Sequence, residues 1–243
     1  MTVKGKLYGI GVGPGSPDLL TLKAADLLQR VPVIFVPVKA HGESSSAMKI
    51  ISPFLDLLDG QEIRELVFPM TRSSNDLREG WKQAAEDVLA VLSEGKDAAF
   101  ITLGDSVLYS TYSYLLDALL KMEPDLAVET IPGITSFSAA AALFDRALAC
   151  GRESLAVVPA TRGMEFLKGV LGSFENVVLL KVASVLDDVL VLLKELGRLD
   201  DAVFISRCGM PGQVMLDNLA LSEEIPRDYF SLILVGKGEH EDE

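Results

Sequence analysis

The sequence predicts an α/β protein of two α/β/α domains, the first with a mostly parallel sheet and the second with a mixed sheet. Short apolar runs alternate with segments of helical period along the chain, which is typical of right-handed βαβ units. The last three apolar runs are separated only by short connections, so antiparallel pairing is expected near the C-terminus. A length of 243 residues suffices for one large core or two smaller ones.

The first series of elements begins with a strand at the N-terminus, and helices follow between successive strands. The clearest helices span 75–92 and 109–121, and the first of them carries one apolar stripe that includes Leu77, Trp81 and Val88. Ser44-Ser45-Ser46 indicates a loop or a helix start. The strands are expected at 6–11, 31–36, 62–68, 97–103 and 127–131.

A second series follows Pro132-Gly133 and opens with a helix over 135–144. We expect a first domain over residues 1–125 and a second over 126–243, joined around residues 122–134. Further helices are expected at 164–171 and 185–196. The strands of this series are expected at 155–159, 176–182, 202–207, 213–218 and 229–235.

Composition excludes several classes of function. A net charge of −13 argues against binding to nucleic acid, and no apolar run reaches the roughly 18 residues that a membrane helix needs. Two cysteines are too few for a disulfide framework and fit the cytoplasm. With two histidines, a histidine-rich metal site is not expected either.

Three motifs at predicted strand ends are candidates for a binding site. The first is the glycine-rich bend from Gly11 to Gly15, which brings bare backbone to the edge of the sheet. Pro14 and Pro17 break the dinucleotide fingerprint, so the bend fits a pocket wall better than a phosphate cradle. A turn without any ligand is the alternative for this segment alone.

The second motif is Gly104-Asp105, followed by the polar run from Tyr109 to Ser113. Asp105 is either a helix cap or a ligand-facing carboxylate at the carboxyl edge of the sheet, beside the glycine-rich bend. The third motif is Pro132-Gly133 with the hydroxyl pair Thr135-Ser136, which either caps a tightly packed helix or meets polar ligand groups. Together the three motifs point to one crevice.

With these motifs in this order, the chain resembles the tetrapyrrole (corrin/porphyrin) methylases, which use S-adenosylmethionine. The family's strand-end Gly-Asp is matched by Gly104-Asp105, and its Pro-Gly-hydroxyl-Ser segment is matched by residues 132–136. The likeness covers residues 6–236. The family's opening G-x-G-P-G-x-P-x-x-L-T-x-x-A is matched by Gly11, Gly13, Pro14, Gly15, Pro17, Leu20, Thr21 and Ala24.

A narrower likeness points to members that methylate carbon 20 of precorrin-2 or cobalt-factor II in cobalamin biosynthesis. It rests on Phe68-Pro69-Met70-Thr71, on the run from Tyr109 to Thr111 with Tyr114-Leu115, and on Tyr229-Phe230-Ser231. The subgroup usually has proline after the Gly-Asp, where this chain has Ser106. This departure leaves the loop geometry and its hydrogen-bond donors open.

The resemblance implies a class III methyltransferase fold, with S-adenosylmethionine in the cleft between the two domains and usually a homodimer. The ligand it implies is a small-molecule tetrapyrrole. No nucleic-acid or membrane partner and no metal site of the protein's own are expected, and whether the substrate holds cobalt stays open. Motif positions imply cofactor contacts at Pro14, Gly104, Asp105, Leu108, Thr135 and Ser136. Strand order alone implies further contacts at Val182, Ala183, Cys208, Gly209, Phe230 and Ser231.

The implied chemistry is displacement at the sulfonium methyl by a nucleophilic carbon of the macrocycle, for which positioning is the main task. Asp105 either accepts the proton lost after methylation or only binds the cofactor, and Tyr109 and Thr111 orient substrate or water. Lys39, Lys181 and Arg207 are further cations near strand ends, and ordinary surface charge is the alternative for each. The substrate contacts are expected at Arg72, Tyr109, Ser110, Thr111 and Arg152.

Three alternatives stay open at this point. One is a methylase of the same family that acts on another ring position, or a diphthine synthase. Another is a non-catalytic nucleotide-binding module. An NAD-dependent dehydrogenase is disfavoured by the proline-broken bend and by the lack of a ribose-binding acid directly after the second strand.

Overall fold

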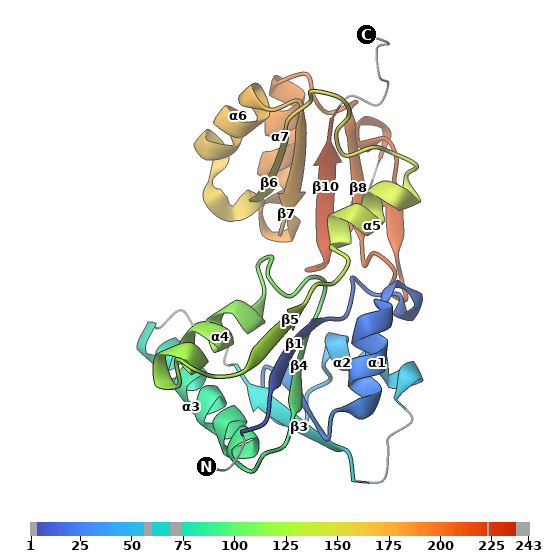
Figure 1. Cartoon of the computed structure of the whole chain (residues 1–243). Coiled ribbons are helices and arrows are strands. Elements are labelled where there is room, and N and C mark those ends of the chain that lie inside the picture. The colour runs from blue at the N-terminus through green and yellow to red at the C-terminus, as the bar shows by residue number, and fades with distance from the viewer. Residues whose placement is uncertain (1–3, 56–59, 69–73, 223, 237–243) are drawn as a thin grey trace. The chain divides into compact units, whose positions relative to one another are not determined.

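A computed structural model describes residues 4–55, 60–68, 74–222 and 224–236. The chain divides into two compact units, and the division falls between Thr135 and Ser136 (Figure 1). Each unit contains a five-stranded sheet with helices packed on it, which confirms the predicted α/β class. No helix in the described part of the chain is long and apolar enough to cross a membrane.

The sheet of the first unit is entirely parallel, with strand order β3-β2-β4-β1-β5. Because all five strands run the same way, their carboxyl ends lie at one edge of the sheet. The strands are β1 (Leu7–Gly11), β2 (Val33–Val38), β3 (Glu62–Val67), β4 (Ala98–Thr102) and β5 (Val128–Ile131).

Helices cover both faces of this sheet, as expected for parallel strands. On one face, α1 (Leu22–Arg30) and α2 (Ser46–Ile51) pack in the core that contains Ile101 of β4. On the other, α3 (Ser74–Ser93) and α4 (Thr111–Met122) pack in the core that contains Phe100. Successive residues of one strand therefore pack in the cores on opposite faces of the sheet. Because both faces are covered, both sets of side chains are apolar, and the strands have continuous apolar sequences.

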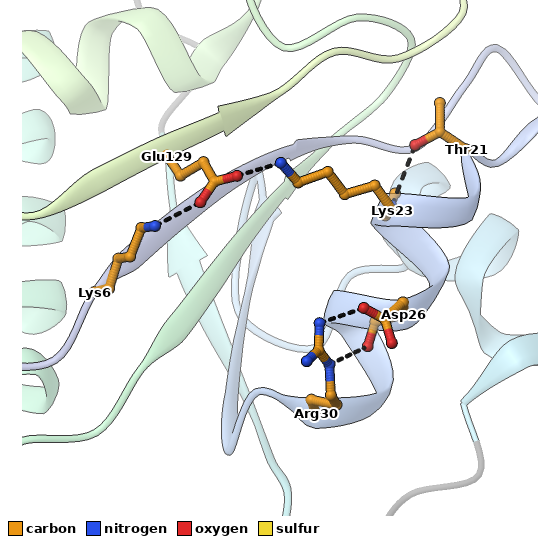
Figure 2. Close-up of polar contacts among 7 residues, drawn as sticks. Lys6, Thr21, Lys23, Asp26, Arg30 and Glu129 are labelled. Carbon is orange, nitrogen blue, oxygen red and sulfur yellow. Dashed lines mark hydrogen bonds and ion pairs between the residues drawn. The ribbon is translucent and has the colours of Figure 1, made fainter.

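The edge strand β5 is tied to its neighbours by charge. The Glu129 carboxylate pairs with Lys6 Nζ at 2.5 Å and also with Lys23 of α1 (Figure 2). Thr21 caps α1, since its Oγ1 accepts a hydrogen bond from the Ala24 amide at 3.2 Å. The expected helix start near Thr21 is therefore confirmed.

The second unit has a mixed sheet with strand order β6-β7-β10-β8-β9. Strands β6 and β7 are parallel, whereas β10 runs antiparallel to both of its neighbours and β9 antiparallel to β8, as predicted. The strands are β6 (Leu155–Pro159), β7 (Asn176–Leu180), β8 (Ala202–Ser206), β9 (Val214–Leu216) and β10 (Ser231–Val235).

Three helices accompany this sheet. Both α6 (Met164–Ser173) and α7 (Leu186–Glu195) pack in one core with inward residues of β7, β8 and β10, while α5 (Ser136–Leu143) contacts β10. Short 3-10 turns complete the chain. They span Pro17–Leu19 (η1), Ser52–Phe54 (η2), Ala160–Arg162 (η3), Ala183–Val185 (η4) and Leu219–Leu221 (η5).

The expected strands and helices are all present, with ends displaced by a few residues. The serine run does start a helix, because Ser45 caps α2. The unit boundary differs from the expected division between residues 125 and 126. Strand β5 pairs in parallel with β1, so residues 126–135 lie with the first unit.

Candidate functional site

The candidate site is built on three loops that follow β1, β4 and β5, which are neighbours in the first sheet. The bend after β1 and the loop after β4 are joined by backbone hydrogen bonds. Gly13 N donates to Gly104 O at 3.1 Å, and Gly104 N donates to Gly13 O at 2.7 Å. The glycine-rich bend and the aspartate loop are therefore in direct contact, as their motifs predicted.

The third loop approaches the other two so closely that only glycine fits. A Cβ on Gly133 would lie 2.1 Å from Gly104 O, and one on Gly11 would lie 2.6 Å from Gly133 N. Gly104 itself has a φ of +71°, and a Cβ there would meet no atom within 4 Å. One side of the Gly104 backbone is thus open, which leaves an approach path for a ligand.

Asp105 holds this arrangement together through both of its carboxylate oxygens. Its Oδ1 accepts from the amides of Val107 at 2.9 Å and Leu108 at 3.1 Å, and its Oδ2 accepts from Gly133 N at 3.0 Å. The interpretation of Asp105 as the helix cap is wrong, because Ser110 caps α4 by accepting from the Tyr112 amide at 3.0 Å. Asp105 instead fastens the second loop to the third.

Two buried hydroxyl groups, whose partners could not be predicted from sequence, support the same loops. Ser106 is fully buried and its Oγ donates to Ile131 O at 2.9 Å, a bond to the end of β5 that proline at this position could not make. The buried Ser110 hydroxyl donates to Thr102 Oγ1 at 3.1 Å. Each hydroxyl reaches a partner outside its own local motif, Ile131 or Thr102, so a local pattern could not reveal the contacts.

Between these fastened points the loop presents an apolar surface. Val107 and Tyr109 are 66% and 51% exposed, and Leu108 is partly exposed as well. Tyr109 has a φ of +51°, a left-handed conformation that is costly for a bulky residue. Thr111 follows at the first position of α4. A strained, exposed aromatic residue on a fixed loop is typical of a ligand contact.

The expected contacts in the second unit also gather at one sheet edge. Val182 and Ala183 follow β7, Cys208 and Gly209 follow β8, and Phe230 precedes the antiparallel β10. Arg207 N donates to Phe230 O at 2.9 Å, which joins two of these segments. Strand order alone therefore predicted residues that this unit does bring together.

Individual side chains in that set differ in what they offer. Val182 is fully buried in the core of this unit. Burial raises the pKa of the Cys208 thiol to about 11, which keeps it protonated and unreactive. Ser231 is only 4% exposed, and its buried hydroxyl has no hydrogen-bond partner among the described residues. Such an orphan hydroxyl is expected where a ligand supplies the missing partner.

Within the second unit, the described cations lie at two different edges of the sheet. Lys181 and Arg207 follow β7 and β8 with φ values of +59° and +53°, so they share an edge of the second sheet. Arg152 precedes β6, which is parallel to β7, and therefore lies toward the opposite edge. Lys39 is exposed just beyond β2. Arg72 lies outside the described residues.

Comparison with known proteins adds relatives of nearly equal length. The family described as Tetrapyrrole (Corrin/Porphyrin) Methylases matches residues 6–221. The cobalt-precorrin-2 C(20)-methyltransferase of Salmonella typhimurium is 34% identical over 97% of this chain and 98% of its own. A probable cobalt-precorrin-2 C(20)-methyltransferase of Methanocaldococcus jannaschii is 37% identical over 95% of both chains.

Other similarities concern the metal-free substrate and the fold. The precorrin-2 C(20)-methyltransferase of a Sinorhizobium species is 33% identical, again over 95% of both chains. The crystal structure of the methyltransferase CobJ superimposes with a TM-score of 0.69 at 20% identity, covering 96% of this chain and 94% of that one. A uroporphyrin-III C-methyl transferase from Thermus thermophilus, complexed with S-adenyl homocysteine, gives 0.65 at 20% identity, covering 96% and 97%.

Proposed function

The chain belongs to the tetrapyrrole (corrin/porphyrin) methylases, and on this basis we propose that it methylates carbon 20 of precorrin-2 or cobalt-factor II, with S-adenosylmethionine as methyl donor. One observation carries the proposal: relatives named for this single reaction match the chain at 33% to 37% identity from end to end. The enzyme is accordingly a C-methyltransferase of cobalamin biosynthesis.

The residues present fit the methyl donor. The open side of Gly104 gives a ligand access to bare backbone, and the orphan Ser231 hydroxyl offers a buried polar group. S-adenosylmethionine supplies an electrophilic methyl on a sulfonium. We assign its contacts in the first unit to Pro14, Gly104, Asp105, Leu108 and Thr135, and in the second to Ser136, Val182, Ala183, Cys208, Gly209, Phe230 and Ser231.

The protein's contribution is positioning. Bound S-adenosylmethionine would supply its methyl group to a nucleophilic carbon of the reduced macrocycle, with S-adenosylhomocysteine and one proton from the methylated carbon as the other products. If the protein holds the macrocycle carbon in line with the methyl group, this orientation can lower the activation barrier by roughly 7 kcal/mol. Loops fixed by Asp105 and Ser106 are suited to this task, because they leave little freedom to the backbone that meets the ligand.

The hydrogen bonds of Asp105 disfavour the role of base and add a role beyond the two considered, that of a residue that positions the loops. A carboxylate that already accepts three backbone amides must weaken one of these bonds before it takes a proton. Tyr109 and Thr111 remain our assignments for orienting the substrate, together with Ser110, whose hydroxyl also caps α4. Arg72 and Arg152 are assigned to the carboxylates of the substrate on charge alone.

Two further parts of the proposal concern the state of the enzyme in the cell. We infer a cytoplasmic homodimer, from the family resemblance and from the low cysteine content. Light scattering coupled to size-exclusion chromatography tests the dimer, and a mass near the 26.2 kDa of one chain would contradict it.

The decisive experiment supplies methyl-labelled S-adenosylmethionine with precorrin-2, in parallel with and without cobalt. Carbon NMR of the product should place the label at carbon 20. A label at another carbon would contradict the ring position while preserving the family, and the faster of the two reactions identifies the substrate. Absence of both transfer and S-adenosylhomocysteine binding would favour the non-catalytic module.

A further inference from the structure

Three aromatic side chains of the first unit form a stack that the site described above does not use. The rings of Phe68 and Trp81 lie 4.4 Å apart between centroids, and those of Trp81 and Tyr114 lie 5.3 Å apart and nearly parallel, at 26°. We call Phe68, Trp81 and Tyr114 the aromatic shelf. Its members come from three separate elements, so the stack exists only in the folded unit.

Two members of the shelf, Phe68 and Trp81, pack on the core, and the third, Tyr114, is exposed to solvent. Phe68 and Trp81 pack against the core between the sheet and the α3–α4 layer, and Phe68 meets the buried Phe100 edge-on at 6.1 Å. Tyr114, in contrast, is 64% exposed. Trp81 therefore backs the Tyr114 ring and fixes its plane, while much of that ring remains in solvent.

The shelf lies at the same edge of the sheet as the candidate site. Phe68 directly follows the carboxyl end of β3, and its amide donates to Val38 O at 2.9 Å. Tyr114 is in the first turn of α4, whose cap Ser110 closes the loop that carries Asp105. One short segment thus joins the shelf to the loop proposed to meet the methyl donor.

Charge beside the shelf suits an anionic ligand. Arg78 and Lys82 are both exposed and are four residues apart on α3, so they occupy the same flank of the helix as like charges. Within the described part of the chain Arg78 makes no ion pair, and Lys82 reaches only Glu86, at 3.7 Å. Glu79 is also exposed and lies three residues before Lys82, so it borders this flank as an acidic neighbour of Lys82.

We propose that the aromatic shelf binds the flat conjugated part of the tetrapyrrole, with Arg78 and Lys82 facing carboxylates at its rim. The assignment rests on the proposed function, and it adds the place where the macrocycle is held. An exposed, rigid aromatic ring beside two exposed cations, of which Arg78 has no ion pair among the described residues, matches a flat polycarboxylate in both shape and charge. It also gives a role to Phe68 and Tyr114, which the sequence marked as features of the carbon-20 subgroup.

The test compares two substitutions at one exposed position. Tyr114→Leu removes the ring but keeps an apolar side chain, and Tyr114→Phe keeps the ring. We expect Tyr114→Leu to raise KM for precorrin-2 and Kd for uroporphyrin III, a stable polycarboxylate probe, by about tenfold. Tyr114→Phe should stay near the wild type, and kcat and the Kd for S-adenosylhomocysteine should be unchanged in both variants.

Two controls separate ring contact from general effects. Phe166→Leu removes a partly exposed ring from α6 of the second unit and should leave the affinity for uroporphyrin III unchanged. Arg78→Gln combined with Lys82→Gln should weaken probe binding at low salt and flatten its salt dependence. If Tyr114→Leu binds uroporphyrin III as tightly as the wild type does, the proposal that the aromatic shelf binds the macrocycle is wrong.

The results also distinguish failure of the aromatic shelf assignment from failure of the proposed methyltransferase function. If the wild type methylates carbon 20 and Tyr114→Leu retains its KM, the shelf alone is refuted. If the wild type transfers no methyl group to any tetrapyrrole, the proposed function fails and the shelf assignment falls with it.

Discussion

The carboxylate of Asp105 accepts a hydrogen bond from the backbone amide of Gly133 at 3.0 Å, across 28 residues of sequence. This bond joins the loop after β4 to the loop after β5, although β1 separates the two strands in the sheet. The two loops approach each other across Gly11, where a Cβ would lie 2.6 Å from Gly133 N and 2.7 Å from Gly104 O. The shape of the candidate site therefore depends on one side chain that spans two strand ends.

Replacing this carboxylate by an amide tests its role. In Asp105→Asn one of the two oxygens becomes an NH2 group, which cannot accept from the amides that Asp105 now serves. We expect a loss of about 1–3 kcal/mol in the free energy of unfolding and about tenfold weaker binding of S-adenosylhomocysteine. Thermal denaturation and calorimetry measure the two effects.

The same variant distinguishes two roles of Asp105, namely holding the loops together and acting as a catalytic base. If Asp105 is the base, Asp105→Asn should bind S-adenosylhomocysteine normally and lose most of its kcat, the opposite of our expectation. Asp26→Asn is the matched control, because Asp26 makes only an exposed ion pair with Arg30. It should change the stability by less than about 0.5 kcal/mol.

Periodicity and turn chemistry were enough to predict where the elements lie. Strand β6 has the predicted bounds, and α1 begins just after its cap Thr21, because local signals decide both. The shared edge of the three motifs also follows from sequence, since parallel strands end on the same side. The parts of the fold that depend on local patterns were thus accessible.

Features that depend on tertiary partners were not predictable. Capping a helix and bracing a loop need the same residue type, so nothing near Asp105 could distinguish the two. Trp81 has the spacing of a core residue and indeed packs on the core, yet its stacking on Tyr114 requires the α3–α4 contact. The boundary after Thr135 is set by the pairing of β5 with β1, which strand order alone reveals.

The buried hydroxyl of Ser106 should contribute measurably to stability. Ser106→Ala removes the donor to Ile131 O and leaves that carbonyl without this partner, at a cost of about 1–3 kcal/mol in the free energy of unfolding. Urea denaturation measures the change. Ser113→Ala, on the exposed side of α4, is the control and should be neutral or slightly stabilising. Equal stability of both variants would show that the hydroxyl bond contributes nothing.

The close approach of the three loops predicts a sharp steric limit at Gly133. The methyl of Gly133→Ala would lie 2.1 Å from Gly104 O, which is backbone and cannot move without disturbing the loops. We expect a loss of about 3 kcal/mol in the free energy of unfolding and weaker binding of S-adenosylhomocysteine. Gly169→Ala, in α6, meets no atom within 4 Å and should instead gain about 0.5–1 kcal/mol. Equal effects of the two alanines would refute the steric argument.

The ion pairs of Glu129 predict how the stability changes with pH. Hydrogen bonds from Lys23 and then Lys6 lower the pKa of the Glu129 carboxyl from 4.5 to about 2 in the folded protein (Figure 2). Because the folded pKa is the lower one, the contribution to stability is complete above pH 4.5 and disappears as the pH falls toward 2. Glu129→Gln should therefore lower Tm at neutral pH, and the difference from the wild type should shrink across that interval.

A second carboxylate shows whether this dependence is specific to the doubly paired site. Among the residues that the structure describes, Glu123 pairs with Lys4 alone, at 2.5 Å, and it is about as exposed as Glu129. Glu123→Gln should change Tm less at neutral pH, because one exposed pair stabilises weakly and is screened by salt. A Glu129→Gln deficit that persists unchanged at pH 2 would mean that packing of the side chain, and not its charge, ties β5 to β1 and α1.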